Sequence, residues 1–160
     1  MNITNTTDNQ YETIRIPNIE MYEQQIINGE LILTPKKLYT REDEIEMFDF
    51  KRSHIEDCII KNEEGEHINI SSKKYRNILI KTWKNIPFQK IIQNTTFNFK
   101  LTRENGNKGY NYCSEIGASF QDKEARLTFI EIINMIKINK MFIDISIKLH
   151  NGKMLYFKVE

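Results

Sequence analysis

Two runs of alternating apolar residues near the C-terminus constrain the fold of this chain more than any other feature. Ile or Leu occupies every second position over 143–149, and apolar side chains alternate again over 155–159. A period of two is typical of half-buried strands, so the two runs predict a β-hairpin. A two-residue loop would place Ile147 opposite Tyr156, whereas a loop over 150–152, with Gly152 in the left-handed region, places Ile147 opposite Leu155. We predict the three-residue loop.

The first 70 residues are predicted to form short strands separated by turns. The expected strands are 11–16, 21–27, 30–34, 45–50, 54–61 and 67–70. Asn28-Gly29 is a strong signal for a two-residue hairpin loop that sets Ile26 opposite Leu31, because both loop positions need positive φ. Glu64-Gly65 is a weaker signal of the same kind.

The spacing of apolar residues becomes helical after residue 70. Tyr75, Ile78 and Leu79 begin a run at i, i+3 and i+4 that predicts a helix over about 72–86, with Ser71 or Ser72 as its N-cap. Pro87 ends that helix. A short second helix is expected over 88–93, and a second main helix over about 122–139.

The predicted fold class is α+β, with a mainly antiparallel sheet, two main helices and the C-terminal β-hairpin. Phe97, Phe99 and Leu101 alternate with polar residues, which predicts a half-buried strand over 97–102, and a returning strand is expected over 108–120. The polar segment 1–10 is expected to be a flexible arm, and 11–160 to be a single domain, because nothing Pro-rich or Ser-rich divides it.

Charge is unevenly distributed along the chain. Residues 41–66 carry four basic and ten acidic side chains, whereas residues 67–110 carry nine basic side chains and one acidic one, Glu104. The net charge is only +1, so any electrostatic attraction to a partner must be local. Either the two segments are neighbours that neutralise each other through exposed ion pairs, worth about 0–1 kcal/mol each, or the basic segment contacts an anionic partner.

The candidate partner-binding residues are the basic side chains of this segment together with one tyrosine. They are Lys73, Lys74, Arg76, Lys81, Lys84, Lys100, Arg103, Lys108 and Tyr110. Aromatic residues interleaved with cations suit stacked bases or nucleotides, but Tyr75, Trp83, Phe97 and Phe99 fall on apolar faces and are predicted to be core. Tyr110 and Tyr112 lie beside a Gly-rich loop, and the sequence does not assign them to the core or to a binding surface.

A metal-dependent nuclease is the alternative from a different class of function. Asp49-Phe50-Lys51 has the acidic-x-Lys form at the end of an expected strand, and Glu30 or Glu42 could add a carboxylate. About two chance matches to so short a pattern are expected, so it carries little weight. His54, Cys58 and His67 look scattered, and no metal or cofactor is predicted.

We therefore expect a non-enzymatic binding protein whose basic face, 67–110, contacts a protein or a nucleoprotein complex, or else a nucleic acid or a nucleotide, and we expect no membrane partner. Self-association, as a homodimer in which opposite poles of two copies meet, is a further alternative. The segment 1–10 lacks the features of a signal peptide, which favours a cytoplasmic location. Abundant Ile, Asn and Lys are typical of AT-rich genomes, and with the small size they suggest a phage or mobile-element inhibitor of a host defence complex.

Overall fold

The computed structural model describes residues 2–7, 10–15, 22–39 and 42–160 of the chain. Contacts divide the chain into two compact units, Met1–Lys37 and Leu38–Glu160. This boundary differs from the expected one after residue 10, and the division into an arm and a single domain stays a prediction. Among the described residues, no helix is both long enough and apolar enough to cross a membrane.

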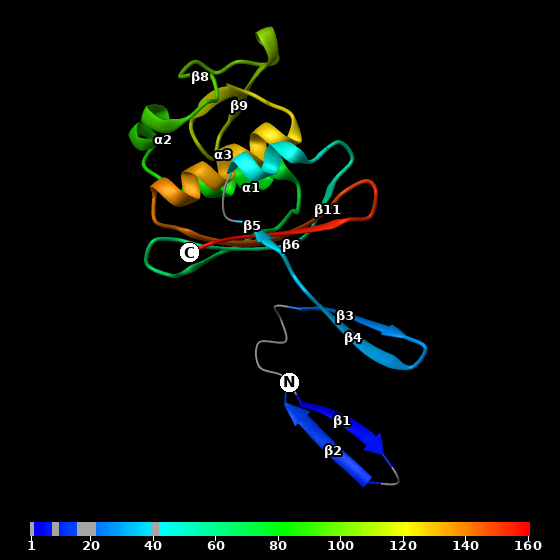
Figure 1. Cartoon of the computed structure of the whole chain (residues 1–160). Coiled ribbons are helices and arrows are strands. Elements are labelled where there is room, and N and C mark those ends of the chain that lie inside the picture. The colour runs from blue at the N-terminus through cyan, green and yellow to red at the C-terminus, as the bar shows by residue number, and fades with distance from the viewer. Residues whose placement is uncertain (1, 8–9, 16–21, 40–41) are drawn as a thin grey trace. The chain divides into compact units, whose positions relative to one another are not determined.

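The first unit contains two antiparallel hairpins: β1 (Asn2–Thr7) with β2 (Gln10–Arg15), and β3 (Tyr22–Ile27) with β4 (Glu30–Pro35) (Figure 1). Asn28 and Gly29 join β3 to β4 with φ values of 51° and 79°, the left-handed values that a two-residue loop requires. Ile26 consequently lies opposite Leu31, which confirms the predicted register. β1 falls within the segment that was expected to be a flexible arm.

The second unit is built on a mixed sheet, called here the large sheet. Its order is β5 (Leu38–Tyr39), β12 (Met154–Val159), β11 (Phe142–Lys148), β6 (His54–Lys61) and β7 (His67–Ile68). Only the pair of β5 with β12 is parallel. β6 begins and ends at the residues predicted for the strand over 54–61.

The C-terminal hairpin has the predicted three-residue loop. Leu149 donates its backbone N–H to Lys153 over 2.8 Å, and Gly152 has a φ of 89°. Ile147 therefore pairs with Leu155, and Ile143 with Val159. The alternating apolar residues of both strands face the core in this register. A register shifted by one residue would turn the apolar residues of one strand to the opposite face.

Two helices, α3 (Ala125–Ile138) and α1 (Tyr75–Lys84), lie over one face of the large sheet (Figure 1). A shorter helix, α2 (Phe88–Asn94), follows α1 in the chain. α3 contacts β11, β12 and α1, and it buries Phe129, Ile132 and Ile136 completely or nearly so. Phe129 packs edge-to-face on Phe157 with ring centroids 5.5 Å apart, which joins the helix layer to the sheet.

A second sheet, called here the small sheet, packs against α1 and α2. Its order is β8 (Phe99–Lys100), β10 (Ala118–Gln121) and β9 (Tyr110–Cys113), and the 3-10 turn η3 (Asn107–Gly109) precedes β9. Trp83 of α1 contacts the rings of Phe99 and Phe120, with both centroids 5.0 Å away. The small sheet thus has one face on the core and one face turned away from α1.

Three local predictions are wrong. Residues expected to form a strand over 45–50 begin instead as a 3-10 helix, η2 (Glu42–Met47), because Ile45 and Phe48 are three residues apart and both pack inward. The strand expected over 108–120 is interrupted between Cys113 and Ala118 by a turn, which makes a hairpin of it. The loop between β6 and β7 is longer than Glu64-Gly65, and His67 pairs with Lys61.

The other corrections concern ends of elements. α1 begins at Tyr75 with Lys74 as N-cap and no side-chain cap, so neither Ser71 nor Ser72 caps it. β8 is shorter than the expected strand over 97–102, and Leu101 beyond it is 77% exposed rather than half-buried.

Candidate interaction surface

The outward face of the small sheet carries the cations and tyrosines that lie together in the structure. Opposed residues in antiparallel strands share a face, and Ser119 lies opposite both Lys100 and Tyr112. Because Phe99 and Phe120 face α1, the alternate residues Lys100 and Tyr112 face away from it. Tyr110 shares that outward face, since it lies two residues from Tyr112.

Two cations on this face are held over tyrosine rings. The Lys100 ammonium lies 4.3 Å from the centroid of Tyr110, and the Arg103 guanidinium lies 4.4 Å from the centroid of Tyr112. A cation over an aromatic face is attracted by the negative ring surface, by about 0.5–1 kcal/mol where it is exposed. Each ring therefore restricts the position of its cation without neutralising the charge.

Hydrogen bonds fix the segment that carries Arg103. Ser119, which is completely buried, donates its hydroxyl to the carbonyl of Thr102 over 2.7 Å and accepts from the backbone N–H of Glu104 over 2.9 Å. These two bonds bracket Arg103 on both sides. Gln121 donates to the carbonyl of Lys108 over 2.7 Å, which attaches the η3 turn to the same sheet.

We call this set of residues the cation–tyrosine face: Lys100, Arg103, Lys108, Tyr110 and Tyr112. Four of its members were predicted as partner-binding residues, and Tyr112 was noted beside them. Within the described part of the chain, none of its cations forms an ion pair with a carboxylate. The Glu104 carboxylate is engaged instead by the Thr102 hydroxyl at 2.8 Å.

The predicted residues on and before α1 form a separate group. Arg76 is paired with Asp122 at 2.8 Å, and Lys81 with Glu115 at 3.2 Å. Lys73 donates to the backbone carbonyl of Glu56 over 2.6 Å. Lys74 and Lys84 are exposed and have no ion pair among the described residues.

The predicted basic surface is therefore divided by the orientation of the strands. α1 packs on the inward face of the small sheet, through Trp83, whereas Lys100 and Tyr110 extend from the outward face. No ion pair joins the described carboxylates of 44–66 to the cations of 67–110.

An apolar hollow beside β8 was not predicted. Phe88, Gln89, Ile92, Phe99 and Leu101 line it, between α2 and the edge of the small sheet. Ile92 is 45% exposed and Leu101 77%. The alternation of Phe97, Phe99 and Leu101 predicted a half-buried strand, and no signal showed that the strand ends at Lys100.

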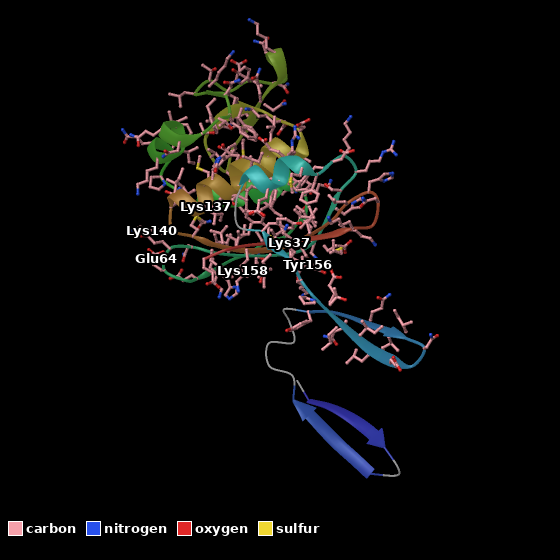
Figure 2. All side chains as sticks on the ribbon, in the orientation of Figure 1. Lys37, Glu64, Lys137, Lys140, Tyr156 and Lys158 are labelled. Carbon is pink, nitrogen blue, oxygen red and sulfur yellow. The ribbon has the colours of Figure 1, made fainter. Side chains whose placement is uncertain are left out.

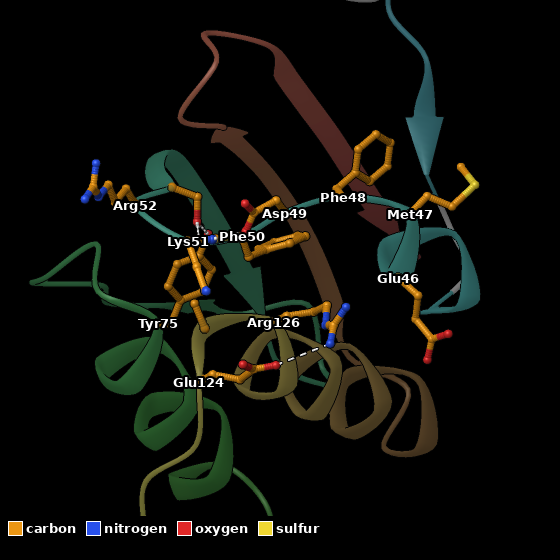
Figure 3. Close-up of a pocket in the computed structure, with 12 residues that line it drawn as sticks. Glu46, Met47, Phe48, Asp49, Phe50, Lys51, Arg52, Tyr75, Glu124 and Arg126 are labelled. Atoms are coloured by element: carbon orange, nitrogen blue, oxygen red, sulfur yellow. Dashed lines mark hydrogen bonds and ion pairs between the residues drawn. The ribbon is translucent and has the colours of Figure 1, made fainter.

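The proposed nuclease residues lie in a different hollow, of about 620 Å³, between η2 and the start of α3 (Figure 3). Asp49 is exposed, and its carboxylate accepts the backbone N–H of Lys51 at 2.9 Å, which closes a turn. The pair therefore lies in a loop and not at a strand end. Glu30 belongs to the other unit, and Glu42 lies among the residues whose side chains are not described.

The histidines and cysteines do not form a metal site in the part of the chain that the structure describes, where no group of three or more metal-ligating residues is found. Cys58 lies on the core side of β6, opposite Ile145. Burial raises the pKa of its thiol to about 12, and the negative charges of Asp57 and Asp144 add to this effect. Cys58 is therefore a poor nucleophile at neutral pH.

Comparisons with known proteins give no match: no protein-family model, no curated protein and no solved structure is similar to the chain. The fold and the surface define this protein as an α+β protein with an outward cation–tyrosine face.

Proposed function

We propose that this is a non-enzymatic binding protein whose cation–tyrosine face contacts an anionic partner. The observation that carries the proposal is the pair of cation–ring contacts, Lys100 over Tyr110 and Arg103 over Tyr112, on one outward sheet face. Neither cation is ion-paired with a carboxylate of the residues that the structure describes.

Such a face suits an anion because its positive groups are positioned before binding. The two hydrogen bonds of Ser119 hold the backbone on both sides of Arg103, and Tyr112 restricts the guanidinium, so less conformational freedom is lost there when a partner binds. An arginine can form paired hydrogen bonds with a carboxylate or a phosphate, and a lysine acts as a point charge. With a net charge of +1, attraction depends on this local cluster and should weaken with salt.

The test is the charge reversal of all three cations in one variant, K100E/R103E/K108E. Fluorescence anisotropy of labelled poly-glutamate and of a labelled oligothymidine would measure binding at about 50 and 300 mM NaCl. We expect the wild-type protein to bind at least one of these probes at low salt and the variant to lose at least tenfold in affinity.

A matched control removes the same charge elsewhere. Lys140, Lys148 and Lys153 lie on elements of or beside the large sheet, and Figure 2 shows Lys140 far from the small sheet. K140E/K148E/K153E should retain affinity within about threefold. Equal losses in both variants would mean that net charge and not the face attracts the probe, which contradicts the proposal.

A third variant, K73E/K81E/K84E, tests the separate cations of α1. Because Lys81 already pairs with Glu115 and Lys73 with a backbone carbonyl, we expect a smaller loss than from the face. A larger loss would move the binding surface to α1.

The other expectations rest on the sequence. Incubation with supercoiled plasmid and Mg²⁺ or Mn²⁺ tests the nuclease alternative, for which cleavage must disappear in D49A. Gel filtration at low and high salt tests for a salt-dependent homodimer. A role as a phage or mobile-element inhibitor of a host defence complex rests on composition and size alone and stays a prediction.

A further inference from the structure

The apolar hollow and the cation–tyrosine face meet at β8. Phe99 and Leu101 line the hollow, whereas Lys100 between them belongs to the outward face. A single short edge strand thus contributes to both surfaces. Because β8 is an edge strand, a partner segment that lies along it would contact both the cations and the hollow.

The hollow exposes two aliphatic side chains. Leu101 is 77% and Ile92 45% exposed, although both border a packed aromatic cluster. Phe99 contacts Phe88 with ring centroids 5.8 Å apart, and it contacts the buried Trp83 at 5.0 Å. The volume of the hollow, about 330 Å³, is at the lower end of the range for ligand sites, about 300–1,000 Å³. It suits one or two inserted side chains.

The charges of the chain segment that forms the hollow are all of one sign. Between Lys84 and Arg103 the sequence contains four cations and no carboxylate. Lys90 on α2 is exposed and has no ion pair within the described residues. A ligand that complements this apolar hollow and the cations around it has apolar side chains flanked by negative charges.

We infer that the hollow docks an acidic segment of a partner protein, which inserts one or two apolar side chains against Leu101 and Ile92. This rests on the proposed function, because the carboxylates of the same segment would be held by Lys100 and Arg103. The apolar insertion would distinguish the correct partner from other polyanions.

A nucleic-acid base fits the lining less well. Bases stack on the exposed flat faces of aromatic rings. Here the rings of Phe88 and Phe99 lie edge to face, at 89°, and Phe99 is also packed on Trp83. The most exposed members of the lining are aliphatic, and an aliphatic side chain pairs with another apolar side chain.

The experiment compares three probes of about equal length. They are a Glu-rich amphipathic peptide with Leu at i, i+3, i+4 and i+7, a poly-glutamate peptide, and an oligothymidine. Trp83 is the only tryptophan and contacts Phe99, so its emission reports occupation of the hollow. Anisotropy of labelled probes gives the affinities independently.

Two double variants separate the hollow from the face. L101S/I92S makes the hollow polar through two exposed positions, and K100E/R103E reverses the adjacent charges. M47S/I59S is the matched control, because these side chains are 68% and 40% exposed elsewhere on the same unit. Circular dichroism and urea midpoints confirm that each variant is folded.

We expect the wild-type protein to bind the Leu-containing peptide at least tenfold more tightly than poly-glutamate. L101S/I92S should lose that preference but retain its affinity for poly-glutamate, and M47S/I59S should retain both. Equal affinity for the two peptides in the wild type, or no effect of L101S/I92S, would overturn the inference. Tighter binding of oligothymidine that depends on Leu101 would also overturn it.

Failure of the proposed function has a different signature. In that case K100E/R103E would leave poly-glutamate binding unchanged, whatever the result at Leu101.

Discussion

Glu131 of α3 accepts hydrogen bonds from both the backbone N–H and the hydroxyl of Thr96, at 3.1 and 3.2 Å. Its second carboxylate oxygen accepts from the hydroxyl of Thr95. Glu131 is only 1% exposed, so these bonds replace its lost hydration. The carboxylate thereby anchors the segment that leads from α2 into β8, and β8 contributes to both the apolar hollow and the cation–tyrosine face.

The first prediction is that E131A destabilises the second unit by about 2–4 kcal/mol, because it leaves the Thr95 and Thr96 donors without this acceptor. Urea unfolding followed by circular dichroism measures the loss. E124A is the control, because the Glu124 side chain is 56% exposed and should cost less than about 0.5 kcal/mol. A loss from E131A no greater than that of the control would show that the carboxylate is not a structural anchor.

The second prediction concerns Ser119 as a positioning residue for Arg103. In S119A the carbonyl of Thr102 and the N–H of Glu104 lose their common partner. We expect faster hydrogen exchange at the amide of Glu104, a loss of about 1–2 kcal/mol in stability, and a several-fold loss in affinity for poly-glutamate.

The exposed Ser114 supplies the control, S114A, in which none of these quantities should change. Unchanged exchange at Glu104 in S119A would contradict the positioning role, whatever happens to the overall stability.

The third prediction is a loss of stability at alkaline pH. Burial raises the pKa of the Cys58 thiol from its ordinary 9.0 to about 12, so as pH rises the unfolded chain loses this proton first. The favourable contribution is therefore present below pH 9 and is lost progressively between pH 9 and about 12, by at most about 4 kcal/mol. Burial also raises the pKa of Tyr75, which acts in the same direction.

Urea midpoints at a series of pH values from 7 to 10.5 provide the measurement. C58A should show a shallower fall above pH 9 than the wild type, and Y75F separates the tyrosine contribution. Parallel curves for the wild type and C58A would show that the Cys58 thiol ionises as readily in the folded protein as in the unfolded chain.

Sequence patterns predicted the parts of the fold in which one local signal decides the geometry. Gly152 and the alternation on both sides of it determine the C-terminal register, and Asn28-Gly29 determines that of β3 and β4. The fold class is confirmed for the same reason, because period two and period 3.6 are local properties. The strand prediction for 45–50 is wrong. Phe48 and Phe50 have the two-residue spacing of a strand, but Ile45 and Phe48 have the three-residue spacing of a 3-10 helix, and that spacing matches the observed structure.

The candidate surface was less accessible to sequence reasoning because it depends on which residues face each other. The charge asymmetry singled out Lys100, Arg103 and Lys108 as candidates, with Tyr110 beside them, but only strand pairing separates these residues from the cations of α1. Leu101 is exposed because β8 ends at Lys100, and the length of β8 is set by its pairing with β10. Glu131 interrupts the apolar pattern of α3. Its partners Thr95 and Thr96 lie 36 and 35 residues earlier in the chain, so no helical or strand periodicity connects them with Glu131.

The last prediction concerns Trp83, whose indole N–H is buried without a hydrogen-bond partner in the part of the chain that the structure describes. Its ring packs edge-to-face on Phe97 and Phe120, at 5.2 and 5.0 Å. W83A should cost about 3–5 kcal/mol by leaving a cavity. W83F should cost only about 1–2 kcal/mol, because phenylalanine keeps an aromatic ring there and removes an unsatisfied donor, which offsets part of the lost packing. Urea unfolding followed by circular dichroism measures both. Equal losses of stability in W83A and W83F would contradict this prediction. They would mean that phenylalanine cannot replace the indole in the contact between α1 and the small sheet.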